Sequence, residues 1–431
     1  MWGSFGSNFA RPLWRSVLVR LWRLTKRTHG VFLLAASMQS GRWRHTATLL
    51  QDGRVLIAGG LRHTPSASSP GMDKFSLADA VLFDPNTYAT TLIEMNERRD
   101  SHTATLLLDG RVFVAGGRSL DRPTQPSFAR DSTEIFDPLT NVFTPGPQLT
   151  TPRFGHTATR LSDGRVLLLG GMATALDSFM TWDEPTDVLS SGELYDANTN
   201  AVEPLSTSMF EKRYGHTAVL DANAGGLGRV CVDGGLFMPS SGAVGAGSEY
   251  YDIETKAFSG IDASGPGLRR HHAIVAIDQD RRALIGGEDI YWLDRDDMGK
   301  MYPLDVQIPG YGWHIPLVIP RTHHTATLLP TGAVLITGGL DAKWSLNYAE
   351  VLPDPFTHPN PASVLTGRSG NSRSGHTATL LPDGAVVIVG GLDMVHGLPW
   401  HEGMTLSDIL VYVYTASQYS KYKLDLGGVG G

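Results

Sequence analysis

Residues 155–171 read GHTATRLSDGRVLLLGG, and a stretch of this form occurs seven times in the 431-residue chain. Each copy has a histidine near its start (His156 here) and closes with a pair of glycines. The histidine precedes the first glycine by 14 residues in six copies and by 18 in the fourth, where the turn is enlarged. A spacing held this tightly is typical of a repeat architecture, so it decides the fold before any single residue does.

Each copy predicts a β-hairpin. In the second copy, two apolar runs (103–108 and 112–115) flank an Asp-Gly turn, and Asp-Gly between β-prone runs favours a tight hairpin. A third strand that ends in aspartate (134–137) and a fourth (141–144) follow before the next histidine. Four antiparallel strands that repeat every 52 to 60 residues predict an all-β fold, a seven-bladed β-propeller of four-stranded antiparallel blades.

The sequence pattern of the repeat resembles that of the kelch family over residues 30–424. The resemblance is to the long-loop form shared with the central domain of galactose-oxidase-like proteins. No Trp-Asp dipeptide closes a repeat, which argues against the WD40 type. For galactose-oxidase-like enzymes the resemblance implies a copper site with a tyrosine cross-linked to cysteine, a second tyrosine adjoining a histidine, and a histidine from an extra domain. This chain has no Tyr-His dipeptide, and its one cysteine, Cys231, lies inside an expected strand. The copper-radical pattern is therefore absent, and we expect no cofactor and no metal.

Composition limits the partners. The formal net charge is −7, and the repeats contain no basic stripe, so we expect no nucleic-acid partner. A single cysteine excludes an intramolecular disulfide. No run of 18 apolar residues occurs, so we expect no transmembrane segment. We also expect a monomer.

Residues 1–27 form a basic amphipathic arm, interpreted as a targeting or disordered segment that is either cleaved or retained. Secretion or export to a periplasm and import into an organelle both stay open. The propeller is expected to span residues 28–424, followed by a glycine-rich tail, 425–431. Two segments could supply the outermost strand that closes the ring, 31–36 or 418–424. Both stay open. Phe32 precedes its repeat histidine by the same 13 residues as Phe143, and this spacing favours a blade strand at 31–36 over the apolar core of a signal peptide.

An arginine stands three residues before each repeat histidine, and each repeat also carries an acid near the start of its third strand. The Arg/His positions are Arg42/His45, Arg99/His102, Arg153/His156, Arg213/His216, Arg269/His272, Arg321/His324 and Arg373/His376, and the acids are Asp79, Glu134, Glu193, Glu249, Asp289, Glu350 and Asp408. Both sets fall near one face, which predicts structural ion pairs. Seven imidazoles around a ring cannot converge on one metal, so we interpret the histidines as structural and bonded to neighbouring backbone. Two repeat histidines directly follow a second histidine, at 271–272 and 323–324, but the spacing of these pairs is not specific for a metal site.

The loops after the glycine pairs differ in length, with 18, 16, 21, 13, 1, 10 and 16 residues before the acid. Function concentrates in such loops on a rigid scaffold. The binding-face candidates are Trp182, Tyr311, Trp313, His314, Trp344, Trp400 and His401. Two polar stretches, 294–299 and 396–408, are interpreted as loops, not metal sites. These features predict a non-catalytic binding or scaffold protein that takes a protein or glycan ligand on the long-loop face. The alternative is a carbohydrate- or small-molecule-active enzyme with its site in the central pocket of that face.

Overall fold

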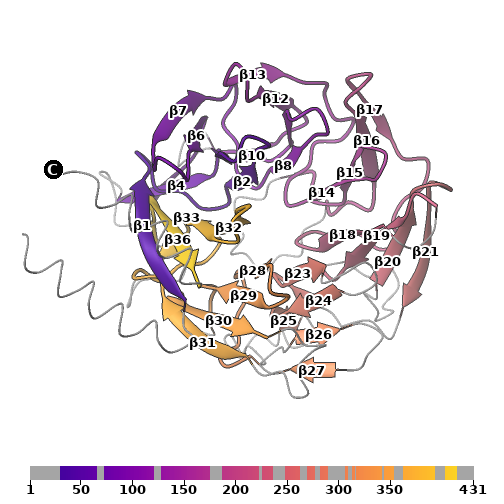
Figure 1. The fold of residues 1–431 in the computed structure, drawn as a ribbon. Coiled ribbons are helices and arrows are strands. Elements are labelled where there is room, and N and C mark those ends of the chain that lie inside the picture. Colours follow the sequence, from indigo (N-terminus) through magenta and orange to yellow (C-terminus); the bar gives the residue numbers. More distant parts are fainter. Residues whose placement is uncertain are drawn as a thin grey trace, which may run out of the picture.

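Four-stranded antiparallel sheets stand around a common axis in the computed structural model of the chain (Figure 1). The structure describes residues 30–65, 72–120, 128–174, 187–222, 226–235, 248–262, 269–276, 282–289, 306–308, 313–315, 317–341, 344–353, 363–393 and 403–414. The predicted arm (1–27) and tail (425–431) lie outside these residues. No helix long and apolar enough to cross a membrane occurs in the described residues.

The sheets follow one another in chain order, and each is built from an inner strand outward. The first sheet consists of β2 (Thr46–Leu49), β3 (Val55–Ala58), β6 (Asp79–Phe83) and β7 (Thr90–Glu94), and the second of β8 (Thr103–Leu106), β9 (Val112–Ala115), β12 (Thr133–Asp137) and β13 (Val142–Pro145). The third consists of β14 (Thr157–Arg160), β15 (Val166–Leu169), β16 (Gly192–Asp196) and β17 (Ala201–Pro204), and the fourth of β18 (Thr217–Asp221), β19 (Arg229–Asp233), β20 (Ser248–Asp252) and β21 (Ala257–Asp262). The fifth sheet consists of β23 (Ala273–Ala276), β24 (Arg282–Ile285), β26 (Val306–Ile308) and β27 (Trp313–Ile315), and the sixth of β28 (Thr325–Leu328), β29 (Val334–Thr337), β30 (Tyr348–Leu352) and β31 (Val364–Arg368). The closing sheet consists of β32 (Thr377–Leu380), β33 (Val386–Val389), β36 (Asp408–Val413) and β1 (Val31–Ser37).

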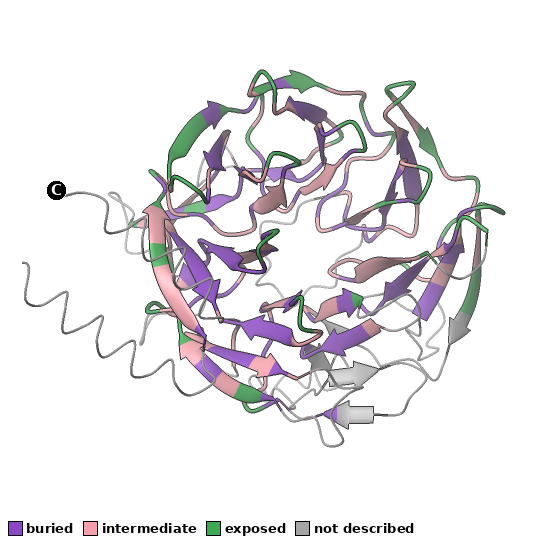
Figure 2. Ribbon diagram, viewed as in Figure 1, coloured by how far each residue is buried: buried purple, intermediate pink, exposed green. Residues whose placement is uncertain are grey.

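The strand that follows each Arg-x-x-His is the innermost of its sheet, as predicted. Neighbouring inner strands contact one another around the ring, for example β2 with β8 and with β32. The second strands carry the apolar runs before the glycine pairs and are buried along their length, whereas outer strands such as β7 are mostly exposed (Figure 2). The fold is therefore a propeller of four-stranded antiparallel blades with its core between the sheets.

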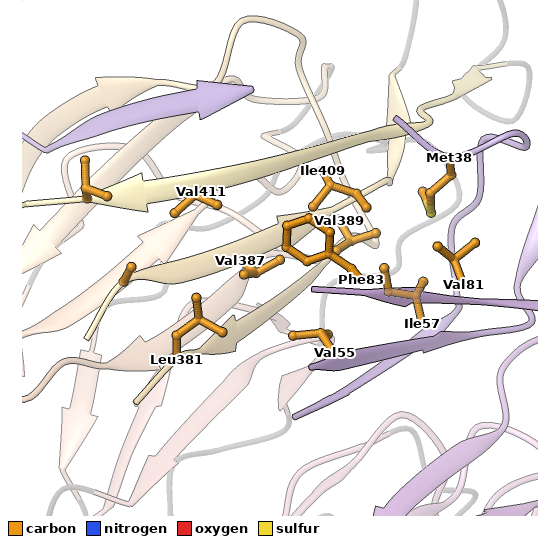
Figure 3. Close-up of a cluster of buried hydrophobic side chains, with 12 residues drawn as sticks. Met38, Val55, Ile57, Val81, Phe83, Leu381, Val387, Val389, Ile409 and Val411 are labelled. Atoms are coloured by element: carbon orange, nitrogen blue, oxygen red, sulfur yellow. The ribbon is translucent and has the colours of Figure 1, made fainter. Parts of the chain in front are cut away.

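Strand β1 closes the ring. It pairs antiparallel with β36, from Val31 opposite Val413 to Ser37 opposite Asp408, with one irregularity in the ladder. The alternative segment, 418–424, lies outside the described residues. Side chains from the closing sheet, such as Val387, pack against Phe83 of the first sheet in one buried cluster (Figure 3). The first and last repeats are thus joined by a ladder and by a shared core.

The fifth sheet departs from the sequence prediction. We expected a one-residue loop after its glycine pair and a third strand beginning at Asp289. Instead, β25 (Glu288–Asp289) pairs with β22 (Arg269–Arg270), and the third strand is β26, which shares one residue pair with β24. The error arose because a short ladder at the loop end was read as the third strand. In other repeats the equivalent contact is an isolated bridge, for example Trp43 with Leu61 and Thr322 with Leu340. Separate short hairpins follow three of the glycine pairs: β4 (Leu61–Pro65) with β5 (Met72–Ser76), β10 (Arg118–Ser119) with β11 (Phe128–Ala129), and β34 (Leu392–Asp393) with β35 (Met404–Thr405).

The repeated glycine pair has a steric cause. At Gly59, whose φ is 55°, an added Cβ would lie 2.4 Å from the carbonyl oxygen of Arg99 and 2.9 Å from Cε1 of His102, both in the next repeat. Only glycine combines this left-handed conformation with so close an approach. The glycine pair therefore belongs to the joint between neighbouring sheets.

Candidate functional site

One residue per repeat, directly before the repeat histidine, lies at the loop end of each inner strand. These residues, which we call the mouth ring, are Arg44, Ser101, Gly155, Gly215, His271, His323 and Gly375. All have positive φ, between 52° and 63°. The conformation costs little for glycine and more for the four other residues. All seven are partly exposed, and each is followed by a buried histidine.

Backbone hydrogen bonds connect the mouth ring from sheet to sheet. Each link joins the amide of one member to the carbonyl of the preceding one: Ser101 to Arg44 (3.0 Å), Gly155 to Ser101 (3.0 Å), Gly215 to Gly155 (3.2 Å), His323 to His271 (3.1 Å), Gly375 to His323 (3.0 Å) and Arg44 to Gly375 (3.2 Å). Side chains at these positions are therefore held at fixed places around the axis. Residues fixed in uncommon backbone conformations cluster at functional sites, because the surrounding structure must hold them there.

Arg44 lies on an aromatic support. Its guanidinium carbon is 4.1 Å from the centre of the Trp43 ring, and Trp43 Nε1 donates to Nε2 of His63 over 3.2 Å. Since Nε2 accepts, His63 carries its proton on Nδ1, which lies 3.1 Å from the Gly403 carbonyl oxygen. Burial first and Lys74 second lower the pKa of His63 to about 4, so this support is neutral at physiological pH.

Asp100 is the buried acid beside the mouth ring. Its carboxylate accepts from Arg118 Nε (2.9 Å), Ser76 Oγ (2.7 Å) and Ser101 Oγ (2.9 Å). Burial alone would raise the pKa of Asp100, but Arg118 and Arg44 outweigh it and the pKa is lowered. Asp100 is therefore an ionised, hydrogen-bonded group that holds Ser101 and Arg118 in place.

His271 and His323 contact each other between two neighbouring sheets, the fifth and the sixth. Their ring centroids are 3.9 Å apart and the rings are inclined by 28°, and Nδ1 of His323 lies 3.1 Å from the Thr322 hydroxyl. These are the first members of the doubled histidine pairs that stood out in the sequence. Two half-buried imidazoles at fixed places are suited to proton transfer.

The repeat histidines are structural, but their partners differ from the prediction. In six of the seven, Nε2 meets a threonine hydroxyl of the preceding sheet rather than neighbouring backbone: His45 with Thr377 (2.9 Å), His102 with Thr46 (3.0 Å), His156 with Thr103 (2.9 Å), His216 with Thr157 (3.0 Å), His272 with Thr217 (2.8 Å) and His376 with Thr325 (2.9 Å). Burial first, and the repeat arginine second, lower the pKa of His102, His216 and His324 to about 3. These imidazoles are neutral connectors between sheets.

One connection lacks its hydroxyl, because Ala273 stands where the other inner strands have threonine. Nε2 of His324 consequently has no hydrogen-bond partner among the described residues. We expect Ala273→Thr to raise the free energy of unfolding by about 1 kcal/mol, the usual net value of one such bond, as measured by urea denaturation. Ala276→Thr, an exposed site on the same strand, is the control. An Ala273→Thr protein no more stable than this control would contradict the interpretation.

The repeat arginines form the expected ion pairs in six sheets. The pairs are Arg42–Asp79 (2.6 Å), Arg99–Glu134 (2.8 Å), Arg153–Glu193 (2.7 Å), Arg213–Glu249 (2.6 Å), Arg373–Asp408 (2.9 Å) and Arg321–Glu350. The side chains of Arg269 and Asp289 lie outside the described part of the structure, although their backbones are strand partners. The arginine side chains of the six pairs are at most 1% exposed, so none of them is open to an anionic ligand.

Most of the predicted binding-face aromatics lie outside the described residues. These are Trp182, Tyr311, Trp400 and His401, and the same holds for 294–299 and for His396 and Glu402 of the other polar stretch. Trp313 and His314 were expected in a loop of the long-loop face, but their backbones form the outer strand β27. Trp344 is half-buried in a loop after a glycine pair, where its amide donates to the Asp341 carboxylate over 2.7 Å. The sequence prediction missed the mouth ring, apart from its two histidines.

Known proteins resemble this chain over part or most of its length. No family model matches the chain. Galactose oxidase from Gibberella zeae is 24% identical over 376 residues, which is 79% of this chain and 49% of that protein. Human kelch-like protein 33 is 28% identical over 138 residues, 32% of this chain and 23% of that protein. The chain thus spans about half of the galactose oxidase.

A solved structure shares the fold. It is described as a novel fungal alcohol oxidase of the AA5 family in complex with copper, and it matches 90% of this chain and 76% of its own with a TM-score of 0.62 and 16% identity. At that identity the likeness concerns the fold alone.

The described residues do not fit a copper site of the cysteine–tyrosine kind. No group of three or more His, Cys, Asp or Glu residues in the described parts is placed to hold a metal ion. Cys231 lies in the interior of β19, opposite Tyr250 of β20, and not in the mouth ring. Burial raises the pKa of its thiol to about 11, so it is not a ready ligand or nucleophile.

The comparisons overturn the prediction of a non-catalytic binding or scaffold protein. The similarity that covers most of the chain is to galactose oxidase, an enzyme, and the match to the kelch-like protein covers a third of it. They agree with the predicted repeat type, since both relatives and the solved structure share it with this chain. The chain is a kelch-type β-propeller related to galactose oxidase and to kelch-like proteins.

Proposed function

We propose that the chain is an enzyme that acts on a hydroxyl-bearing small molecule, a carbohydrate or an alcohol, at the mouth ring. The observation that carries the proposal is the set of side chains there: two imidazoles, a guanidinium and a hydroxyl, all belonging to partly exposed residues. Outside the mouth ring, the seven repeat histidines and the six repeat arginines whose side chains are described are buried. The similarity to an enzyme named for its action on galactose supports a sugar or alcohol substrate.

The mouth ring suits proton transfer at a substrate hydroxyl. A neutral imidazole has one nitrogen that accepts and one that donates, and its pKa lies near neutrality when unperturbed. In the proposed step, one imidazole of the His271–His323 pair accepts the hydroxyl proton. The cationic Arg44 then stabilises the negative oxygen that remains. Stacking of the two rings keeps them oriented, and Asp100 fixes Ser101 beside Arg44 in the ring.

A substrate screen tests this proposal. The purified chain is incubated with a panel of neutral sugars, sugar acids and primary alcohols, product formation is followed by proton NMR, and oxygen consumption is recorded with and without added copper(II). We expect turnover of at least one compound, reduced at least ~100-fold in His271→Ala/His323→Ala without a change in melting temperature. Turnover that survives in this double variant would place the chemistry elsewhere. Leu139→Ala, at a fully exposed turn of β12–β13, is the control variant.

We also propose that the fifth sheet is a complete blade, which makes the ring seven-bladed. Its inner strand β23 contacts β18 and β28 in both neighbouring sheets, and its Ile285 and Ile315 share a buried cluster with Val334 of the next sheet. Hydrogen exchange tests this proposal. Amides of β24 and β26 that are protected to the same degree would support a complete blade, and fast exchange confined to β26 and β27 would contradict it.

A further inference from the structure

The second strand of the fourth sheet, β19, presents different side chains to its two neighbours. Alternate residues of a strand point to opposite faces of its sheet. Val230 and Val232 lie in one buried cluster with Leu167 of the third sheet. The residues between and after them, Cys231 and Asp233, therefore face the fifth sheet.

The contact between the fourth and fifth sheets contains a buried ion pair. Two nitrogens of Arg282, in β24, donate to the two carboxylate oxygens of Asp233 over 2.9 and 3.2 Å. The Asp233 side chain is fully buried and that of Arg282 is 12% exposed. Ser248 donates its hydroxyl proton to the same carboxylate. We call Cys231, Asp233, Ser248 and Arg282 the polar seam.

Both charges stand at positions that are apolar in nearly all other repeats. The residue four before the first glycine of the pair is valine in six repeats and Arg282 in the fifth. The residue directly before that glycine is Asp233 in the fourth repeat. Its equivalents in the other repeats are Ala58, Ala115, Leu169, Ile285, Thr337 and Val389. The two charged exceptions lie in neighbouring repeats and meet across one contact between sheets.

A buried ion pair holds two sheets together less firmly than packed apolar side chains, because both charges lose their water. Between the third and fourth sheets, Leu169 and Val230 occupy the equivalent positions and share a buried cluster. The stability of a repeat protein is approximately a sum over its units and the interfaces between neighbours. The interface that contributes least is therefore expected to open first.

We infer that the ring has a built-in opening point, at which the fourth and fifth sheets separate along the polar seam while the rest of the ring stays folded. Gly215 and His271 of the mouth ring precede the inner strands of these two sheets, and an added Cβ at Gly215 would lie 3.8 Å from the His271 ring. Separation would therefore widen the mouth ring at this place. The inference does not depend on the proposed enzymatic activity.

The reaction of Cys231 with N-ethylmaleimide, followed by mass spectrometry without denaturant, tests the inference. Cys231 is the only cysteine of the chain and is 1% exposed, so its thiol reacts from a state in which the polar seam is open. The matched control, Cys231→Leu/Leu167→Cys, places the thiol at the equivalent position of the third sheet. Each rate is divided by the unfolded fraction that urea denaturation gives for the same protein. On this scale we expect the wild type to react about tenfold faster or more.

A second variant replaces the ion pair by the residues of other repeats. Asp233→Leu/Arg282→Val should slow the reaction of Cys231 about tenfold or more on the same scale. Arg111→Gln, which removes a charge from an exposed pair in a turn of the second sheet, should leave it unchanged. A wild type that reacts no faster than the control with the moved cysteine overturns the inference, and so does a double variant that reacts as fast as the wild type. If the double variant does not fold, the moved cysteine alone decides.

Discussion

The protein is expected to unfold cooperatively at about pH 5, above the pH at which carboxylates ordinarily protonate. The cause is the set of buried repeat histidines. The pKa of His102, His216 and His324 is lowered to about 3, and that of His45, His156 and His376 is also lowered, in each case by burial first. In the unfolded chain the same imidazoles titrate near 6.5.

The sign follows from proton binding. Above pH 6.5 neither state binds a proton on these groups, so they contribute no pH dependence. Between pH 6.5 and about 3 the unfolded state binds protons that the folded state excludes, and stability falls as the pH falls. At pH 5 each of the three histidines with a pKa of about 3 shifts the balance by about 2 kcal/mol, or about 6 kcal/mol together, and the other three act in the same direction. That is comparable with the whole stability of a typical domain, about 5–15 kcal/mol.

Urea denaturation between pH 8 and pH 4 checks this prediction. The free energy of unfolding should be flat above about pH 7 and then fall with a slope of several protons per molecule. Lowered carboxylate pKa values, such as those of Asp52 and Asp109, act only at still lower pH. Stability that stays flat down to pH 4 would show that the repeat histidines take up protons without unfolding the ring.

Arg153→Ala is expected to lower the free energy of unfolding by about 3–5 kcal/mol. Both Arg153 and Glu193 are buried, and Arg153 also donates to the carbonyls of Gly170 (2.8 Å) and Ser191 (3.1 Å). Removal of the guanidinium leaves the Glu193 carboxylate buried, with the amides of Thr150 and Thr151 as its remaining donors among the described residues. The loss is large because an uncompensated charge remains, not because the pair itself is strongly stabilising.

Chemical denaturation of Arg153→Ala beside Arg111→Ala measures the difference. Arg111 and its partner Asp109 are 37% and 44% exposed, and such surface pairs contribute about 0–1 kcal/mol. The double variant Arg153→Met/Glu193→Leu removes both charges and should recover much of the loss. A single variant no worse than Arg111→Ala would mean that water reaches the repeat pairs.

The repeat explains why so much of the fold followed from the sequence. The spacing of the repeat predicted the positions of the inner strands, the ion pairs and the glycine pairs, because equivalent residues make the same contacts in each repeat. The prediction failed in the fifth repeat, where the pattern is weakest: Glu288 and Asp289 resemble the start of a third strand but extend the loop end of the first two. The position of Phe32 predicted a strand at 31–36 but not that it closes the ring, which its ladder with β36 shows.

The candidate site was harder to predict, because its residues share a position rather than a residue type. Arg44, Ser101 and His271 look unrelated in sequence, and only the alignment on the following histidine brings them together. Positive φ at four non-glycine members was not readable from residue identity. The exposed tryptophans drew attention instead, since aromatic residues are common binding anchors.

The pairing of β1 with β36 has a consequence for synthesis of the chain. Strand β1 leaves the ribosome before any other described strand, whereas its partner is among the last. At typical translation rates the two are made roughly 20 to 75 s apart. During that interval the segment Val31–Ser37, with the sequence VFLLAAS, has no ladder to join, and unpaired apolar strands are prone to aggregate. Ring closure is therefore expected to be the last event in folding of the nascent protein, and a chaperone that shields β1 would act on it before any other part of the ring.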